Sequence, residues 1–305
     1  MRKDLLSVAN LNHDELWQII ENALELKRKG TKPILTGQTL ALIFEKPSLR
    51  TRVSFDVAIS QLGGHVIYLS GEEVGLGRRE PIRDMARVLS RYVNLIIART
   101  FSHTTLESLA QYASVPVINA LSDREHPCQA ISDLLTIYEK KGKLEGLTLA
   151  FIGDGNNVAN SLLLACALTG VNFKIASPEG YQVEESILKL GKSLAQGSEI
   201  LLAKEPRTVV QNADVIYTDV WTSMGQEAER DKRRQDFAAY QVTPELLAQA
   251  KPDAILMHPM PVHWGEELRE ELADHPQSVL IDQAENRLHA QKAILVKMAG
   301  KEKSP

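Results

Sequence analysis

Residues 48–52 (Ser-Leu-Arg-Thr-Arg) gather positive charge and hydrogen-bond donors at a point where a strand is expected to give way to a helix. The apolar run 39–43 before them is typical of a buried strand, and the apolar spacing after them is helical. A helix beginning at Ser48 would direct its free N–H groups and the positive end of its dipole into this turn. Together with the two arginines and the threonine, those groups would bind an anion such as a phosphate. A capped helix with solvated arginines explains the same pattern, so the rest of the chain has to decide.

Two further loops place polar side chains after expected strands. Arg99 follows the strand expected over 94–98, which puts a guanidinium at the same rim of the same sheet. His126 and Gln129 stand three residues apart at the beginning of the helix expected over 128–140. A lone histidine is most often structural, but this pair beside two arginine-bearing loops indicates donors that could polarise a carbonyl group.

Residues 153–157 (Gly-Asp-Gly-Asn-Asn) resemble the beginning of a dinucleotide-binding fingerprint. The full pattern is absent, because Val158 occupies the position of the third glycine. The next strand ends in Ser177-Pro178, without the acid that would hold a ribose hydroxyl. A nicotinamide cofactor is therefore not expected, and the two asparagines could instead bind a zwitterion or an amide.

Two loops farther along the chain also follow expected strands. Asp219 stands just after the strand expected over 215–217, where its carboxylate would lie on the ligand side of a sheet. The dense charge run 227–236 after it is expected to form a solvated face. Residues 258–263 (His-Pro-Met-Pro-Val-His) have a stiff backbone, and Met260-Pro261 is a candidate cis peptide bond. No cluster of His, Cys and Asp has the spacing of metal ligands, so neither a metal nor a cofactor is expected.

These loops need a scaffold that brings strand ends together, and the alternation of apolar runs predicts one. Strands and helices alternate in two successive series, which predicts an α/β fold of two open, doubly wound domains with mainly parallel sheets and helices on both faces. The boundary is expected at 140/141, with a cleft between the domains, and the helix over 284–298 is long enough to return to the first domain. Residues 71–80, glycine-rich and charged, are expected to form a mobile loop. Strands are expected over 39–43, 66–69, 94–98, 115–118, 147–152, 173–176, 199–202, 215–217, 254–257 and 279–281, and helices over 12–29, 48–62, 81–92, 104–112, 128–140, 158–168, 184–193 and 284–298.

Composition narrows the class of protein. A chain of 305 residues with 44% hydrophobic and 24% charged residues suits two soluble globular domains. Its formal net charge of −4 argues against nucleic-acid binding through bulk electrostatics. The two cysteines, Cys128 and Cys166, form no disulfide framework, and neither a signal peptide nor a membrane-spanning stretch is recognisable. A cytoplasmic protein without membrane or nucleic-acid partners is expected.

The order and spacing of four motifs resemble the aspartate/ornithine carbamoyltransferase family over about residues 3–300. The motifs are 48–52, His126-Pro-Cys-Gln129, 153–157 and Asp219-Val-Trp-Thr-Ser-Met-Gly225. The last two, with Arg87-Val-Leu-Ser-Arg-Tyr92 and Ala284-Glu-Asn-Arg287, are most similar to the ornithine branch. The resemblance implies a transferase that moves the carbamoyl group of carbamoyl phosphate to the δ-amine of L-ornithine, giving L-citrulline and phosphate. It also implies a homotrimer or a larger assembly of trimers and a role in arginine biosynthesis, with the degradative direction left open.

Carried over motif by motif, the resemblance implies a carbamoyl-phosphate-binding domain over residues 1–140 and an ornithine-binding domain over 141–283, with 284–305 packing back on the first. The residues that match the carbamoyl-phosphate site are Ser48, Leu49, Arg50, Thr51, Arg99, His126, Gln129 and Arg287. Those that match the ornithine site are Asn157, Asp219, Ser223, Met224, Pro259 and Met260. The catalytic residues would be Arg99, His126 and Arg287, which could donate to the developing oxyanion together with Thr51, and Asp219, which would orient the amine.

Three positions depart from the family pattern. Leu49 replaces a common threonine, and Gly75 stands where many ornithine enzymes have a glutamine that reaches a neighbouring subunit's site. Pro259-Met260 replaces the usual Cys-Leu, and proline offers only its carbonyl where that cysteine helps to bind the amino acid. The alternative function is therefore a carbamoyltransferase for a different amine or amino acid, such as putrescine, aspartate or an N-acylated ornithine. A non-catalytic anion-binding relative and a nicotinamide enzyme are the alternatives from other classes.

Overall fold

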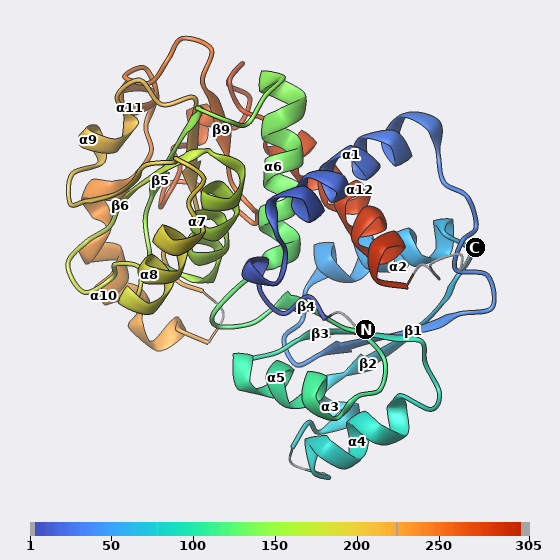
Figure 1. Cartoon of the computed structure of the whole chain (residues 1–305). Coiled ribbons are helices and arrows are strands. Elements are labelled where there is room, and N and C mark those ends of the chain that lie inside the picture. The colour runs from blue at the N-terminus through green and yellow to red at the C-terminus, as the bar shows by residue number, and fades with distance from the viewer. Residues whose placement is uncertain (1–3, 78, 224, 300–305) are drawn as a thin grey trace. The chain divides into compact units, whose positions relative to one another are not determined.

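A computed structural model describes residues 4–77, 79–223 and 225–299 (Figure 1). The chain divides into two compact units, the first running up to Leu135 and resuming at Asn286, the second comprising Thr136–Glu285. Both crossings lie inside helices, α6 (Pro127–Lys141) and α12 (Leu280–Ala299). The sequence pattern predicts the divisions at 140/141 and 283/284 instead. A pattern of apolar residues locates helices, but it does not show that the two ends of one helix belong to different units.

The first unit is built on a four-stranded parallel sheet in the order β2-β1-β3-β4. Helices α4 and α5 cover one face, where Ala41, Ile96 and Leu106 belong to one buried apolar cluster. α2 lies on the other side of the sheet (Figure 1). Since both faces are covered, the central strands are apolar throughout rather than alternating. The elements of this unit are η1 (Val8–Asn10), α1 (His13–Lys29), β1 (Thr39–Phe44), α2 (Leu49–Gln61), β2 (His65–Ser70), α3 (Gly71–Val74), α4 (Ile82–Leu89), β3 (Leu95–Arg99), α5 (His103–Tyr112) and β4 (Val117–Leu121).

The second unit is built on a five-stranded parallel sheet in the order β7-β6-β5-β8-β9. Its α7 is buried at every position from Val158 to Thr169, which agrees with its mostly apolar sequence. The elements of this unit that follow α6 are β5 (Thr148–Ile152), α7 (Asn157–Thr169), β6 (Asn172–Ala176), α8 (Glu185–Leu194), β7 (Ile200–Ala203), α9 (Pro206–Val210), β8 (Val215–Thr218), η2 (Glu227–Glu229), α10 (Arg230–Asp236), η3 (Ala238–Tyr240), α11 (Pro244–Leu247), β9 (Ile255–Met257) and η4 (Glu270–Leu272). The predicted α/β fold with parallel sheets and flanking helices is confirmed.

Each sheet has one point at which the strand order reverses. In the first unit it lies between β1 and β3, and in the second between β5 and β8. Loops that leave the carboxyl ends of such strand pairs diverge and leave a crevice, which is where open α/β sheets bind ligands. The loops at these ends contain residues 45–52 and 99–102 in the first unit, and 153–157 and 219–223 in the second.

The last helix returns to the first unit, as predicted. Lys27 Nζ donates to Asn286 Oδ1 at 2.8 Å, which ties α1 to α12. The strand expected over 279–281 is wrong, because Ser278 makes only an isolated bridge to Leu256 and α12 already begins at Leu280. Ile281 is 74% exposed, whereas a buried strand would have covered it. An apolar run of three residues is too short for its period to distinguish a strand from the first turn of a helix.

Two other expectations need correction. Residues 71–74 of the expected loop form α3, capped by Ser70, whose Oγ accepts from the backbone N–H of Glu73 at 3.3 Å. The short helices α9, α10 and α11 were not expected, and α10 turns one side chain of the charge run, Arg233, into the protein. Among the described residues, no helix combines the length and the hydropathy that crossing a membrane would require.

Candidate functional site

The helix α2 begins with a capped first turn. Ser48 has an extended backbone (φ −160°, ψ 111°), and its Oγ accepts from the backbone N–H of Thr51 at 3.4 Å. The Ser48 hydroxyl also donates to Thr51 Oγ1 at 3.0 Å. The side chain of Leu49 is 76% exposed, so only the backbone of this residue can serve a ligand at the helix N-terminus.

Arg99 ends β3, and local irregularity directs its side chain. The register of β3 on β4 shifts between Ala98 and Arg99, and a bulge of this kind re-aims the side chain next to it. The Arg99 carbonyl accepts from the backbone N–H of Glu45 at 2.8 Å, so the loops after β1 and β3 are joined through their backbones. The pKa of Arg99 is lowered to about 10, mainly by burial and to a smaller extent by the charges of Arg287 and Arg50.

The three arginines of this region form a cationic group. Arg99 and Arg287 are 5% and 4% exposed, and burial also lowers the pKa of Arg50. Among the described residues, no carboxylate forms an ion pair with Arg50 or Arg99. Holding several like charges together away from water is unfavourable unless an opposite charge joins them. The group is therefore suited to bind an anion.

Arg287 reaches this group from the C-terminal helix. Its Nη2 donates to Thr51 Oγ1 at 2.7 Å, and Thr51 is 1% exposed. Thr51 Oγ1 thus accepts from both Ser48 and Arg287. The structure brings Arg287 to the first turn of α2.

His126 lies immediately before α6 and is 5% exposed. Its carbonyl accepts from the backbone N–H of Gln129 at 3.0 Å, which begins the helix. Burial holds the pKa of His126 well below its ordinary value, and the charges of Arg287 and Arg99 act in the same direction. At neutral pH the imidazole is uncharged, so it can donate one N–H to a substrate oxygen without carrying a positive charge.

Gln129 and Cys128, which lie in α6 just after His126, have side chains whose chemistry is restricted by their surroundings. Gln129 Nε2 donates to Asp133 Oδ1 at 2.8 Å. Burial raises the pKa of the Cys128 thiol to about 12, so this thiol is not a nucleophile at neutral pH. One N–H of the Gln129 amide is therefore used within its own helix, and the second N–H and the carbonyl oxygen remain for other contacts.

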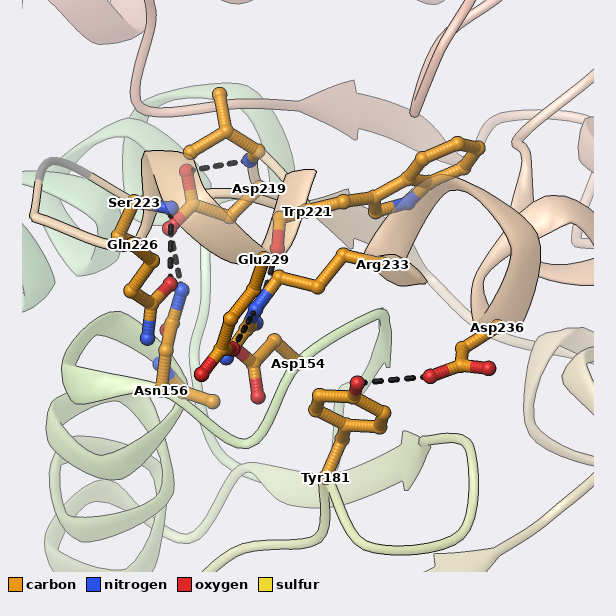
Figure 2. Close-up of polar contacts among 12 residues, drawn as sticks. Asp154, Asn156, Tyr181, Asp219, Trp221, Ser223, Gln226, Glu229, Arg233 and Asp236 are labelled. Carbon is orange, nitrogen blue, oxygen red and sulfur yellow. Dashed lines mark hydrogen bonds and ion pairs between the residues drawn. The ribbon is translucent and has the colours of Figure 1, made fainter. Parts of the chain in front are cut away.

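In the second unit, Asn156 and Asp219 meet at the β5–β8 reversal. Asn156 caps α7, its Oδ1 accepting from the N–H groups of Val158 and Ala159 at 2.9 and 3.1 Å. Its Nδ2 donates to Asp219 Oδ2 at 2.8 Å (Figure 2). Burial raises the pKa of Asp219, and the hydrogen bonds from Asn156 and the Val220 N–H oppose that rise.

The sequence pattern indicates both asparagines as possible ligands of a zwitterion or an amide, but the family resemblance assigns only Asn157 to the ornithine site. Asn157 is the first residue of α7 and is half-buried. The signal for Asn156 was present, because asparagine directly before a helix is a common cap and its second amide atom is then free to point outward.

The turn after Asp219 is closed by local hydrogen bonds. The backbone N–H of Ser223 donates to Gln226 Oε1 at 3.0 Å, and the Gln226 N–H donates back to the Ser223 carbonyl at 3.0 Å. Met224, assigned to the same site, lies outside the described residues.

Pro259 and Met260 lie in a loop whose backbone is fixed by hydrogen bonds to side chains. The Met260–Pro261 bond is cis, as predicted. His258 Nδ1 accepts from the Met260 N–H at 2.8 Å, which places the imidazole proton on Nε2, 3.1 Å from Glu267 Oε1. Gln283 Oε1 accepts from the His258 N–H at 2.8 Å. The loop therefore keeps its place independently of the ring of Pro259.

One group of side chains has the composition of a metal site. Ligand atoms of His263, Glu266 and Glu267 lie within 4.8 Å of one another, and no other such group occurs among the described residues. Glu266 is already paired with Arg230 and Arg234, and Glu267 Oε1 accepts from the His263 N–H at 2.7 Å. These contacts explain the cluster as part of an ion-pair network rather than a cation site.

Comparison with known proteins adds an independent line of argument. The family model "Aspartate/ornithine carbamoyltransferase, carbamoyl-P binding domain" matches residues 3–139, and the model "Aspartate/ornithine carbamoyltransferase, Asp/Orn binding domain" matches residues 145–298. A curated ornithine carbamoyltransferase of Archaeoglobus fulgidus is 53% identical over 304 residues, which are 98% of either chain. An anabolic ornithine carbamoyltransferase of Pyrococcus furiosus is 50% identical over 304 residues, 98% of this chain and 96% of that relative. A solved structure of ornithine carbamoyltransferase from Pyrococcus furiosus matches with a TM-score of 0.95 at 49% identity and covers 99% of this chain and 98% of that one.

Proposed function

The chain belongs to the aspartate/ornithine carbamoyltransferase family, and on that premise we propose that it transfers the carbamoyl group of carbamoyl phosphate to the δ-amine of L-ornithine, giving L-citrulline and phosphate. The observation that carries the proposal is the cationic group of Arg50, Arg99 and Arg287 around the first turn of α2. Three neighbouring guanidinium groups can bind both the phosphate dianion of carbamoyl phosphate and the carbonyl group next to it. The similarity of the whole chain to ornithine carbamoyltransferases supports ornithine as the acceptor.

The phosphate of carbamoyl phosphate would bind at the N-terminus of α2. Backbone N–H groups of the first turn and the Arg50 guanidinium would neutralise the negative charge that accumulates as this leaving group departs. Ser48 and Thr51 would fix its position through their hydroxyls. Because the N–H groups are already oriented by the capped helix, they need no rearrangement during the reaction.

The carbonyl oxygen of the substrate would lie among Arg99, His126 and Arg287. Attack by the amine on the carbonyl carbon turns this oxygen into an oxyanion, which the two guanidiniums and the neutral imidazole would stabilise as donors. The bond between carbon and the phosphate oxygen then breaks, and the departing phosphate would accept the proton that the amine loses. The step balances for attack by the neutral δ-amine: the C–N bond forms, the C–O bond to phosphate breaks, and one amine proton passes to the phosphate.

The amino acid would bind through residues of the second unit. The Asp219 carboxylate, held by Asn156, would bind an ammonium or amine group of ornithine and orient it. Ser223 and Met224 would add contacts from the following turn, and Asn157 from the start of α7. We therefore propose carbamoyl-phosphate binding for residues 1–140, ornithine binding for 141–283 and a packing role for 284–305, in line with the domain descriptions of the two family models.

The proposal extends to assembly and location. A homotrimer, or a larger assembly of trimers, would cover apolar side chains at the surface of the first unit, where Leu49, Val53 and Phe101 are 76%, 50% and 51% exposed. Residues 71–80 would then contribute to a neighbouring subunit's site. A cytoplasmic location in arginine biosynthesis agrees with two buried, unlinked cysteines. Light scattering of the purified protein tests the trimer, and a monomeric mass would contradict it.

A panel of acceptors tests the reaction. The purified protein is incubated with carbamoyl phosphate and, separately, ornithine, putrescine, lysine, aspartate or N-acetylornithine, and products are identified by mass spectrometry. Citrulline is expected from ornithine, with a much slower or absent reaction for the others. An Arg99→Gln variant separates enzymic transfer from spontaneous carbamoylation. Formation of another carbamoylated amine in place of citrulline would contradict ornithine as acceptor, and no product above the Arg99→Gln level would contradict catalysis.

One observation favours a second candidate function, a carbamoyltransferase for another amine. Pro259 and Met260 stand where ornithine enzymes usually have Cys-Leu, and Pro259 is buried. Proline lacks both an N–H and a side-chain polar group, so this position binds an amino acid through its carbonyl alone. The same panel of acceptors decides between the two.

A further inference from the structure

Arg233 is buried although it lies in the charge run 227–236. Its side chain is 7% exposed, whereas the side chains of its neighbours Lys232 and Arg234 are 68% and 45% exposed. The run as a whole was expected to be solvated, and at Arg233 that expectation is wrong. A buried arginine is unfavourable unless several acceptors surround it, so its contacts indicate what it does.

The guanidinium of Arg233 joins three separate parts of the second unit. Its Nη1 donates to Asp154 Oδ2 at 2.7 Å and to the Trp221 carbonyl at 3.0 Å. Its Nε donates to Glu229 Oε2 at 2.9 Å, in η2 immediately before α10. Figure 2 shows the guanidinium lying between Trp221 and Asp154.

Two of these partners belong to the loops that carry the candidate ornithine site. Asp154 stands two positions before Asn156, and Trp221 stands two positions after Asp219 and two before Ser223. Asn156 and Asp219 are themselves hydrogen-bonded at 2.8 Å. The contacts therefore close a ring, from Asn156 along the chain to Asp154, through Arg233 to Trp221, and back along the chain to Asp219. The two loops are thus connected at two points, by the Asn156–Asp219 hydrogen bond and by Arg233. Two connections prevent one loop from rotating relative to the other about a single contact.

A third segment supports the same guanidinium. The ring of Tyr181 lies 4.9 Å from Arg233 Cζ, and the Tyr181 hydroxyl donates to Asp236 Oδ2 at 2.8 Å. The Tyr181 carbonyl accepts from the Gly155 N–H at 2.8 Å, next to Asp154. Only arginine offers a planar face for an aromatic ring together with several donors in one plane, so lysine cannot reproduce these contacts.

We propose that Arg233 is a positioning residue for the amino-acid substrate: through Asp154 and the Trp221 carbonyl it holds residues 153–157 and 219–223 so that Asp219 and Ser223 face the same ligand. The role in substrate binding rests on the proposed function, and the mechanical role on the contacts alone. Carbamoyl phosphate, assigned to the first unit, should bind independently of Arg233.

Kinetics of an Arg233→Lys variant test the substrate role. The KM for ornithine is expected to rise about tenfold or more, which corresponds to losing one charge-assisted hydrogen bond. The KM for carbamoyl phosphate should stay within about twofold of the wild type. Arg234→Lys is the matched control, because it makes the same substitution at the next position, where the side chain pairs with Glu266 at the surface. Asp154→Asn, which keeps the shape and removes the charge, should reproduce the ornithine effect.

Hydrogen exchange of the backbone amides tests the mechanical role without any assay of activity. Exchange of residues 220–223 and 225–226 is expected to become about tenfold faster or more in Arg233→Lys and in Asp154→Asn, and to stay unchanged in Arg234→Lys. Unchanged exchange in both variants would overturn the proposal, whatever the enzyme does. Faster exchange with an unchanged KM for ornithine in an active enzyme would also overturn it. A wild type that forms no citrulline contradicts the proposed function instead, and the exchange experiment still decides the role of Arg233. Should Arg233→Lys fail to fold, Asp154→Asn carries both measurements.

Discussion

Arg287 donates from Nη2 to the Oγ1 of Thr51 at 2.7 Å, although the two residues are 236 positions apart in the chain. The contact brings the last helix to the first turn of α2, where Ser48 already donates to the same hydroxyl. The N-terminal strand-to-helix turn is therefore completed by a guanidinium from the far end of the sequence. The cationic group of the first unit is therefore complete only when Arg287 of the last helix is in place.

Replacing Arg287 with glutamine should lower kcat more than it raises KM for carbamoyl phosphate. Glutamine can still donate one hydrogen bond to Thr51, but it carries no charge to stabilise the oxyanion. The loss of one oxyanion donor costs about 10²- to 10³-fold in kcat. Steady-state kinetics with saturating ornithine provide the measurement. Lys297→Gln, on the same helix in a 3.8 Å pair with Glu15, is the control and should be nearly silent. A normal kcat for Arg287→Gln would exclude the oxyanion role.

The buried His126 makes a prediction about stability at acidic pH. Its pKa in the folded state lies well below the ordinary value of 6.5 because of burial and the charges of Arg287 and Arg99. Below pH 6.5 the unfolded chain therefore binds a proton at this histidine that the folded chain does not bind. The free energy of unfolding decreases as the pH falls. His126→Gln removes this group and should make the stability less dependent on pH, by about 1 kcal/mol between pH 6.5 and 5.5. Urea unfolding at the two pH values measures it, and equal pH dependence in both proteins would show that His126 titrates normally.

The features that sequence could predict are those with local causes. The cap at Ser48 and the cis bond before Pro261 depend on a few consecutive residues, and both occur. Strands buried on both faces are largely apolar, so each observed strand could be predicted, but the same reasoning also predicts a strand over 279–281, where α12 begins. The alternation of helices and strands predicts that the sheets are parallel, but it does not specify the order of the strands within each sheet.

The remaining features have causes that are distant in the chain. The contact of Arg287 with Thr51 depends on how the last helix docks, and no local pattern carries that information. Arg233 looks like its exposed neighbours in the sequence, and only its place on α10 relative to Asp154 and Trp221 separates it from them. Whether a charge in a run of charges is buried depends on acceptors supplied by other segments.

Replacing Pro259 with cysteine should lower the KM for ornithine by about two- to tenfold, because a thiol adds a hydrogen-bonding group at a buried position of the proposed amino-acid site. The loop should tolerate the change, since Gln283 and His258 hold its backbone through the N–H groups of His258 and Met260. Pro259→Ala is the matched control, because it removes the ring without adding sulfur. Steady-state kinetics at saturating carbamoyl phosphate give the KM. Equal KM values for the cysteine and alanine variants would show that the sulfur has no part in amine recognition here.

Asp219 should impose a pH dependence on ornithine binding. Burial raises its pKa, so its carboxylate begins to take up a proton at a higher pH than an ordinary aspartate does. The KM for ornithine should therefore rise as the pH is lowered toward that pKa, while the KM for carbamoyl phosphate changes less. Asp219→Asn should raise the KM for ornithine about 10- to 100-fold at neutral pH and abolish the acidic rise. The two KM values measured from pH 5 to 8 check this, and an acidic rise that survives in Asp219→Asn would assign it to another group.

Gly155 allows the backbone of residues 182–183 to pack closely against the glycine-rich loop 153–157. A Cβ at this position would lie 2.5 Å from the carbonyl carbon of Gln182 and even closer to the Val183 nitrogen, so the second glycine makes room for a neighbouring backbone. Gly155→Ala should cost about 1–3 kcal/mol of folding free energy through overpacking, and it should raise the KM for ornithine by displacing Asp154 and Asn156. Urea unfolding and steady-state kinetics measure the two effects. Gly180→Ala is the control, since a Cβ there has strain at φ 86° but meets no atom within 4 Å, so it should lower stability without changing the KM. A normal KM in Gly155→Ala would mean that the loop can shift without moving the amino-acid site.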